Sequence, residues 1–241
     1  MTPEECVKAI AGAVGRVGGE WMFDGVVHAK GAELGLDPWA WYHVGRGGVL
    51  GSCDPSVVVA AFGFFNPAVQ IKAWNKGIAV LEPRKAAELY AAECAAFGTR
   101  RFGSLDAAGR LADLLTKALD SATIMALPVF AGWRTLLHTY DGATGPERLA
   151  LALQAAREHR GGSHLVAVAG YGVPPLQALL SGRNGAPNAQ FFGWPEPYPD
   201  PELGKERMTA AERITNAMVA PAFEVLTDDE RAELTAGLRA L

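Results

Sequence analysis

Cysteine is scarce in this sequence. The three cysteines, Cys6, Cys53 and Cys94, are far apart, and no CxxC pair is present. Neither a disulfide framework nor a cysteine-based zinc site is therefore expected. Scattered thiols of this kind fit a protein of the reducing cytoplasm.

The sequence also lacks an excess of basic residues. Lys and Arg total 22 against 26 Asp and Glu, so the formal net charge is −4. This balance gives no electrostatic reason to expect avid, sequence-independent binding to nucleic acid or anionic lipid, although a local basic patch is not excluded.

Long hydrophobic runs of the membrane-spanning kind are missing too. The first ten residues carry glutamates where a signal peptide would carry a basic and then an apolar segment. The longest stretch without Asp, Glu, Lys or Arg is 161–182, and His164, Pro174 and Pro175 interrupt it. We expect buried helices there, no export signal and no membrane partner.

Alternating apolar and polar runs are almost absent, whereas Ala, Leu, Glu and Arg fill the periodic segments. The sequence therefore predicts an all-α fold, a multi-helix bundle with little or no β-structure. Five X-Pro junctions and two Thr-x-x-Glu capping boxes, beginning at Thr209 and Thr227, mark helix starts. The predicted helices span 3–18, 20–35, 38–45, 54–65, 67–80, 83–99, 104–138, 146–160, 163–171, 174–181, 208–225 and 228–239.

Two segments qualify this map. The helix 104–138 is expected to kink near 124–128, where Pro128 interrupts its leucine spacing. Between Leu180 and Arg207, proline, glycine and aromatic residues exclude a regular element. Because its aromatic side chains are costly to leave in water, we predict that this Pro- and aromatic-rich loop is an ordered flap on the helical body.

The domain organisation is expected to be simple. We predict a single compact helical unit over 1–241, with a weak seam near 141–145 between an N-terminal half, 1–140, and a C-terminal half, 146–241.

The densest polar cluster is REHRGGSH at 157–164. Its imidazoles, guanidiniums and carboxylate, separated by a Gly-Gly turn, suit anion binding or acid–base chemistry near neutral pH. The functional interpretation makes His159 or His164 the catalytic acid–base group and gives ligand binding to Arg157, Glu158 and Arg160. In the alternative interpretation these residues cap helices, pair with one another and pack in the core.

The same cluster is a poor metal site or nucleophile triad. His159 and His164 are five residues apart, which is not one helical turn, and no HExxH motif accompanies them. Ser163 lacks a GxSxG elbow. We predict no metal ligands, and no residue pattern identifies a cofactor.

A second candidate is the segment 39–51, in which Trp41 and His43 precede a glycine-rich turn that contains Arg46. Its glycine spacing matches neither GxGxxG nor GxxxxGK[ST], so nucleotide binding is not expected. Either Arg46 turns back to a helix terminus or an internal carboxylate, or Arg46 and the aromatic residues line a pocket.

A third candidate is FGFF at 62–65, which supplies apolar surface at helical spacing. A core stripe is the default interpretation. If the segment instead meets the flap across a cavity, Phe65 and Trp194 form the apolar wall of a small-molecule pocket.

The order of these motifs resembles an actinobacterial family whose members are labelled helix-turn-helix proteins. Its motifs read GRxxPLG, FxxFxP followed by Trp, and REHRGDGH; here they read GRGGVLG at 45–51, FGFFNP at 62–67 with Trp74, and REHRGGSH at 157–164, before GW at 193–194. The resemblance spans most of the chain. It implies a winged-helix-derived α scaffold with a helix-turn-helix-like segment.

The chain departs from that family at three places. Val49 replaces a proline, and Gly162-Ser163 replaces Asp-Gly. Family members follow GW with a helix and a wing-like hairpin, whereas this chain has a short Pro-rich passage from Trp194 to Met208. The wing is therefore expected to be reduced or absent.

The sequence favours a protein that binds a small organic, natural-product-like ligand in an interior pocket, as an enzyme or a sensor. The alternative is a dimeric DNA-binding transcription regulator that uses 163–181 as its helix-turn-helix. Its would-be recognition helix, 173–180, offers Gln177 alone for base reading and no basic residue before Arg183, which disfavours DNA. A scaffold role is a third alternative, and a homodimer is compatible with each.

Overall fold

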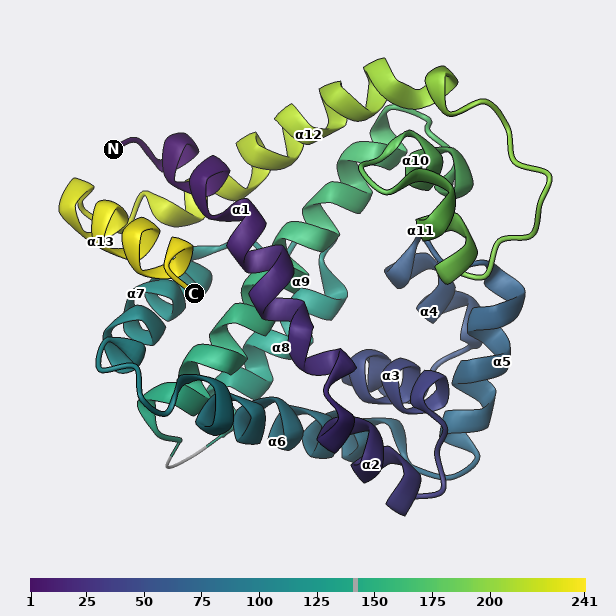
Figure 1. The fold of residues 1–241 in the computed structure, drawn as a ribbon, viewed down its shortest axis with the longest axis horizontal. Helices are drawn as coiled ribbons and strands as arrows, with labels where there is room; N and C mark the ends of the chain where they lie inside the picture. The colour runs from purple at the N-terminus through teal and green to yellow at the C-terminus, as the bar shows by residue number, and fades with distance from the viewer. Residues whose placement is uncertain (141–142) are drawn as a thin grey trace.

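The structure is a computed structural model that describes every residue except 141–142. The described residues form thirteen α-helices and four short 3-10 helices and contain no strand, which confirms the predicted all-α class (Figure 1). The α-helices are α1 (Pro3–Glu20), α2 (Gly25–Glu33), α3 (Pro38–Gly47), α4 (Pro55–Phe62), α5 (Pro67–Ile78), α6 (Pro83–Phe102), α7 (Ala108–Ser121), α8 (Pro128–Thr139), α9 (Gly145–Gly170), α10 (Pro175–Ser181), α11 (Gly185–Phe191), α12 (Lys205–Val219) and α13 (Asp228–Arg239). The 3-10 helices are η1 (Trp21–Phe23), η2 (Gly48–Leu50), η3 (Pro201–Gly204) and η4 (Ala220–Phe223).

Local capping explains where the helices begin. The residue before proline accepts a hydrogen bond from a first-turn N–H at the starts of α3, α4, α5 and α6, where the caps are Asp37, Asp54, Asn66 and Glu82. The capping box at Thr227 is confirmed. The one at Thr209 is wrong, because Thr209 lies inside α12 and donates to the Lys205 carbonyl over 2.9 Å.

The helix α9 runs through the middle of the fold and packs against α1, α6, α7, α8 and α12 (Figure 1). The two predicted helices 146–160 and 163–171 are thus one helix, and the predicted Gly-Gly turn is wrong. Gly161 and Gly162 continue the helix, and a Cβ on Gly162 would lie 2.8 Å from Leu127 Cδ2. Close packing, not a change of direction, accounts for glycine at 162.

Two further boundaries differ from prediction. The segment 104–138 is two helices, α7 and α8, separated by a non-helical stretch in which Ala126 has a φ of 62°, so the predicted kink is a complete break. The predicted glycine-rich turn at 45–51 is largely helical, because α3 extends to Gly47 and η2 follows. Arg46 therefore projects from a helix and not from a loop.

The flap is ordered, as expected, but it is not irregular throughout. It contains α11 and η3, which corrects the prediction that no regular element fits there. Trp194 Nε1 donates to the Phe64 carbonyl over 2.8 Å, and the rings of Phe192 and Phe65 lie 4.5 Å apart. These contacts fasten the flap to the segment between α4 and α5.

One hydrophobic cluster contains buried residues from Cys6 to Leu238 and so includes both predicted halves. The predicted seam includes Asp141 and Gly142, which lie outside the described residues, so the domain division stays a prediction. No described helix combines the length and apolar character needed to cross a membrane.

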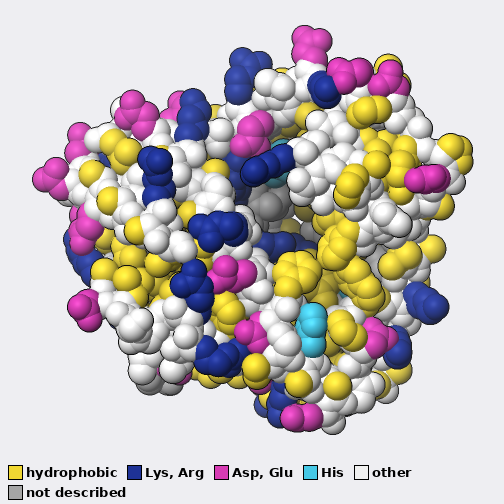
Figure 2. Space-filling view, in the orientation of Figure 1, with side chains coloured by type: hydrophobic (Ala, Val, Ile, Leu, Met, Phe, Trp, Pro, Cys, Tyr) yellow, Lys and Arg dark blue, Asp and Glu magenta, His cyan; other side chains and the backbone are white. Residues whose placement is uncertain are grey.

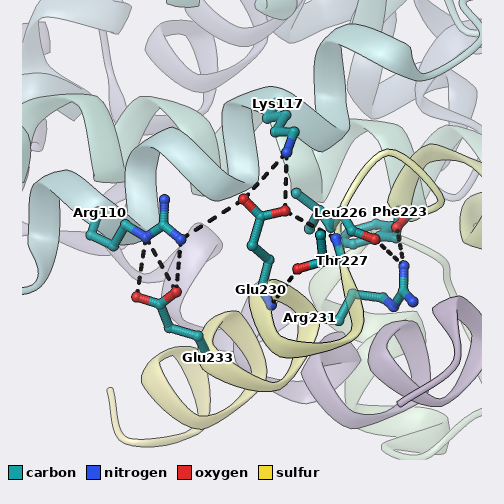
Figure 3. Close-up of polar contacts among 8 residues, drawn as sticks. All are labelled: Arg110, Lys117, Phe223, Leu226, Thr227, Glu230, Arg231 and Glu233. Atoms are coloured by element: carbon teal, nitrogen blue, oxygen red, sulfur yellow. Dashed lines mark hydrogen bonds and ion pairs between the residues drawn. The ribbon is translucent and has the colours of Figure 1, made fainter.

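The C-terminal helix α13 docks on α7 through charged pairs (Figure 3). Arg110 Nη2 lies 2.9 Å from Glu233 Oε2, and Lys117 Nζ lies 3.0 Å from Glu230 Oε2. Beneath them Leu234 and Leu238 are fully buried.

Candidate functional site

The face shown in Figure 2 is hollowed near its centre, with basic side chains on part of the rim and hydrophobic ones opposite. A cavity of about 370 Å³, here called the central cavity, is lined by residues of α1, α3, α9 and α12, by the segment 62–65 and by Phe192. Segments from most of the chain length therefore converge on one cavity.

A buried ion pair lies beside this cavity. Arg46 donates through Nε and Nη2 to the two carboxylate oxygens of Glu158, over 2.7 and 2.8 Å. Arg46 also donates to the Tyr42 hydroxyl over 2.9 Å, and its guanidinium lies 4.0 Å above the centre of the Phe62 ring. Arg46 thus meets an internal carboxylate and also lines the cavity, so both alternatives for this residue hold geometrically.

Both members of the pair are charged. Burial alone would raise the pKa of Glu158, but the charges of Arg46 and Arg157 and the amide of Gln154 outweigh it, and the pKa is lowered. Burial would likewise lower the pKa of Arg46, but Glu158 outweighs it and the pKa is raised. A bidentate pair of this kind is a fixed, desolvated dipole beside the cavity.

His164 and Arg160 form another part of the cavity wall. Thr215 Oγ1 donates to the Ala211 carbonyl and lies 2.9 Å from His164 Nδ1, so it accepts from Nδ1, and Nε2 is the unprotonated nitrogen. Burial lowers the pKa of His164, although Glu212 opposes the shift. The side chain is therefore a neutral imidazole near pH 7, with one basic nitrogen.

The neighbouring Arg160 is held by α12. Its Nη1 donates to Asn216 Oδ1 over 3.0 Å, and its Nη2 pairs with Glu212. Both partners lie more than fifty residues further along the chain.

Two further cavities adjoin the central one. The first, about 270 Å³ and here called the aromatic cavity, contains Phe23, Trp39 and Phe191 and shares Tyr42, Phe65, Arg157 and Phe192 with the central cavity. The second, about 350 Å³, lies beside the start of α8 and shares Arg46 and Leu165. Arg157 and Arg46 thus stand at the two boundaries of the central cavity.

Four predicted site residues lie away from the cavities just described. Trp41 is buried and donates from Nε1 to the Val27 carbonyl, and His43 is buried against Phe62 with Nδ1 2.8 Å from the Trp39 carbonyl. His159 packs against the Phe130 ring at 4.6 Å, and burial lowers its pKa to about 4. Trp194 holds the flap against the segment between α4 and α5 through its hydrogen bond to the Phe64 carbonyl. Of the two predicted catalytic histidines, the structure brings only His164 to the central cavity.

The other predicted residues, Arg46, Phe65, Arg157 and Arg160, line the central cavity, and Glu158 lies behind it in the wall of the cavity beside α8. Sequence reasoning missed Tyr42, Phe192 and Glu212 as lining residues. Tyr42 lies one helical turn before Arg46 and was detectable by that spacing. Glu212 carried no signal, since its partner is 52 residues away.

The predicted DNA-reading helix corresponds to α10, which buries four of its seven residues. Its one candidate base-reading side chain, Gln177, is buried and donates from Nε2 to Ser181 Oγ and to the Asp200 carbonyl. Between Trp194 and Asp200 no described residue is in a helix or strand, so the passage holds no wing hairpin. Among the described residues no group of three or more His, Cys, Asp or Glu is placed to hold a metal ion.

These features define an all-α protein in which short helix–turn–helix junctions follow a long central helix. The chain matches the Helix-turn-helix family over residues 7–241 and belongs to that family. No curated protein and no solved structure matches it.

Proposed function

We propose that this protein binds a small organic ligand in the central cavity, as an enzyme or as a sensor. The observation that carries the proposal is the division of the cavity wall into two kinds of surface. Arg46, Arg157, Arg160 and His164 supply polar groups, and Phe62, Phe64, Phe65 and Phe192 supply an aromatic wall. A largely apolar cavity with a few convergent polar groups is the usual form of a small-molecule site.

The chemistry available in the cavity is that of a neutral base and fixed cations. Nε2 of His164 is a proton acceptor for an enzyme, and the arginines orient a carbonyl or an anionic group. The same groups suffice for recognition without turnover. No residue pattern favours a particular cofactor.

Filling the cavity tests the proposal. Gly161 lines the central cavity, and a Cβ built on it meets nothing within 4 Å, so we expect Gly161→Phe to project its ring into the cavity. Gly170, on the same helix, also has nothing within 4 Å but is exposed at the helix end, so Gly170→Phe is the matched control. The probe is phenylnaphthylamine, an uncharged dye whose fluorescence rises in apolar surroundings.

We expect the wild type and Gly170→Phe to bind the dye equally and Gly161→Phe to bind at least about tenfold more weakly, since the aromatic wall is blocked. Circular dichroism melts check that each variant is folded. Equal binding by all three proteins contradicts the proposal.

A second candidate function, DNA binding by a transcription regulator, is favoured by membership of the Helix-turn-helix family. The predicted helix-turn-helix, 163–181, comprises the end of α9 and α10. The next pair, α10–α11, has a three-residue connection in which Arg183 is exposed, and Gln190 is exposed on α11. A regulator of this kind binds as a homodimer to two half-sites. The buried Gln177 and the net charge of −4 speak against it.

Electrophoretic mobility shifts with genomic DNA fragments at low salt test this second function. A DNA-binding regulator gives a shift that weakens steeply with salt. Arg183→Glu then weakens the shift, whereas Arg239→Glu on α13 leaves it nearly unchanged. Absence of a shift at low salt rejects the regulator.

A further inference from the structure

We infer that the ligand of the central cavity is an organic anion whose charged group pairs with Arg157. The inference rests on the proposed function and specifies the class of ligand. The charged groups around the cavity do not balance one another.

Three arginines and two carboxylates meet around the cavity. Glu158 pairs with Arg46, and Glu212 pairs with Arg160. Arg157 is the third cation, and the carboxylate it reaches is Glu158, which Arg46 already neutralises. The polar wall therefore carries one positive charge more than its carboxylates compensate.

The hydrogen bonds point to the same residue. Glu158 Oε1 accepts from Arg46 over 2.7 Å and from Gln154 over 2.8 Å, so the bond from Arg157 Nη1, at 3.2 Å, is the longest of the three. A guanidinium has five N–H donors. With one of them directed to Glu158, Arg157 retains donors for a ligand, and its side chain is 29% exposed where the central and aromatic cavities meet.

Arg157 is also held in place by the neighbouring helix. A Cβ on Gly19 of α1 would lie 3.2 Å from Arg157 Nε, so α1 packs closely along this side chain. A guanidinium that is already confined loses less conformational entropy when it binds an oxyanion, and it binds such groups through two parallel hydrogen bonds. Confinement and unused donors together favour a ligand's carboxylate, sulfonate or phosphate.

The rest of the ligand is specified by the opposite wall. Phe62, Phe64, Phe65 and Phe192 present aromatic surface to the same cavity. The chemistry that fits both walls is an anionic head on a flat, apolar body. Purely polar anions lack the aromatic contact, and neutral apolar compounds lack the contact with Arg157.

Two dyes that differ by one charged group test the inference. Anilinonaphthalene sulfonate has the ring system of phenylnaphthylamine plus a sulfonate. Arg157→Gln removes the surplus charge but leaves Glu158 paired with Arg46 and Gln154, so the fold is retained. Arg148→Gln is the control, since Arg148 is half-buried on the same helix and pairs with Asp113 outside the cavity.

We expect Arg157→Gln to lower the affinity for the sulfonate at least about tenfold more than it lowers the affinity for phenylnaphthylamine, whereas Arg148→Gln changes neither. If the neutral dye binds and Arg157→Gln does not weaken the sulfonate, the inference is overturned while the proposed function stands. If neither dye binds the wild type, both fail. Circular dichroism melts of the variants separate a local effect from unfolding.

Discussion

The Arg46–Glu158 pair joins side chains 112 residues apart and is almost entirely shielded from water. Such a pair contributes little net stability, because desolvation offsets much of the attraction between the charges. Its loss on one side is a different matter, since the remaining charge stays buried without its main partner.

Arg46→Met is therefore expected to lower the free energy of unfolding by about 3–5 kcal/mol, measured by urea denaturation. The double variant Arg46→Met/Glu158→Leu should recover part of that loss, because no buried carboxylate is left uncompensated. The test compares the loss of unfolding free energy in the double variant with the summed losses of Arg46→Met and Glu158→Leu. A loss in the double variant as large as that sum, or larger, would contradict this account of the pair.

Glycine positions in α9 give a second contrast between single residues. Gly161→Ala should raise the free energy of unfolding by about 0.5–1 kcal/mol, since alanine is the better helix former and its Cβ meets nothing within 4 Å. Gly162→Ala should gain less or be destabilising, because Leu127 must move to admit the methyl group. Urea denaturation of both variants checks this; a larger gain for Gly162→Ala would be inconsistent with the packing described.

The residue types of the site were predictable from the sequence, whereas their partners were not. The sequence singles out the cluster at 157–164 by its density of polar side chains, and the Arg46 segment by its aromatic residues before a glycine-rich turn. Which carboxylate faces Arg46 is decided by how α3 crosses α9, a tertiary fact with no local signature. For the same reason His159 and His164 could not be separated by inspection, although one packs on α8 and the other lines the cavity.

At the scale of elements, helix starts were more predictable than helix continuity. Asx and Thr caps and first-turn prolines act through local hydrogen bonds, so Asp37, Asp54 and Thr227 marked true starts. Gly-Gly in α9 and the break before Pro128 depend on what packs alongside, and both were misjudged. Thr209 failed because its hydroxyl bonds backward to Lys205, as threonine inside a helix does.

Two substitutions in α13 distinguish the ionic from the apolar contribution to its packing on the rest of the protein. Glu233→Gln removes an exposed pair with Arg110 and should cost at most about 1 kcal/mol, decreasing with added salt. Leu234→Ala removes a fully buried side chain and should cost about 2–5 kcal/mol at any salt concentration. Thermal or urea unfolding at low and high salt measures both; a strong salt dependence of the Leu234→Ala effect would contradict the assignment.

At the scale of the whole molecule, two buried histidines couple stability to pH. Burial lowers the pKa of His43 and of His159 to about 4, from an ordinary value near 6.5. Below about pH 6.5 the unfolded chain therefore takes up protons that the folded chain does not. Stability is greatest above that pH and falls as the pH decreases toward about 4.

Urea unfolding at pH 7 and at pH 5 should show a loss of about 2 kcal/mol per buried histidine. His159→Gln removes one of the two groups and should reduce the loss by about half. His138→Gln, at a half-exposed position on α8, retains both buried histidines and should leave the loss nearly unchanged. An identical pH dependence in all three proteins would be evidence against this origin.

The cavity itself could not be predicted from the sequence. Its wall combines α1, α3, α9, α12, the segment 62–65 and Phe192, and no local pattern predicts how six separate segments meet. Composition and periodicity predicted the all-α class because those signals are summed over every helix. The absence of a wing hairpin after Trp194 was also predictable, since the prolines of that passage exclude both a helix and a central strand.

The packing of α1 has a consequence for how the protein is made. Beyond the adjoining η1, the main partners of α1 are α9, α12, η4 and α13, all encoded after residue 144. During synthesis the first helix therefore waits on the order of ten seconds before its partners leave the ribosome. Its apolar stripe of Val7, Ile10, Val14 and Val17 stays uncovered throughout that interval. The buried face of α1 can therefore be covered only after more than half of the chain has been synthesised.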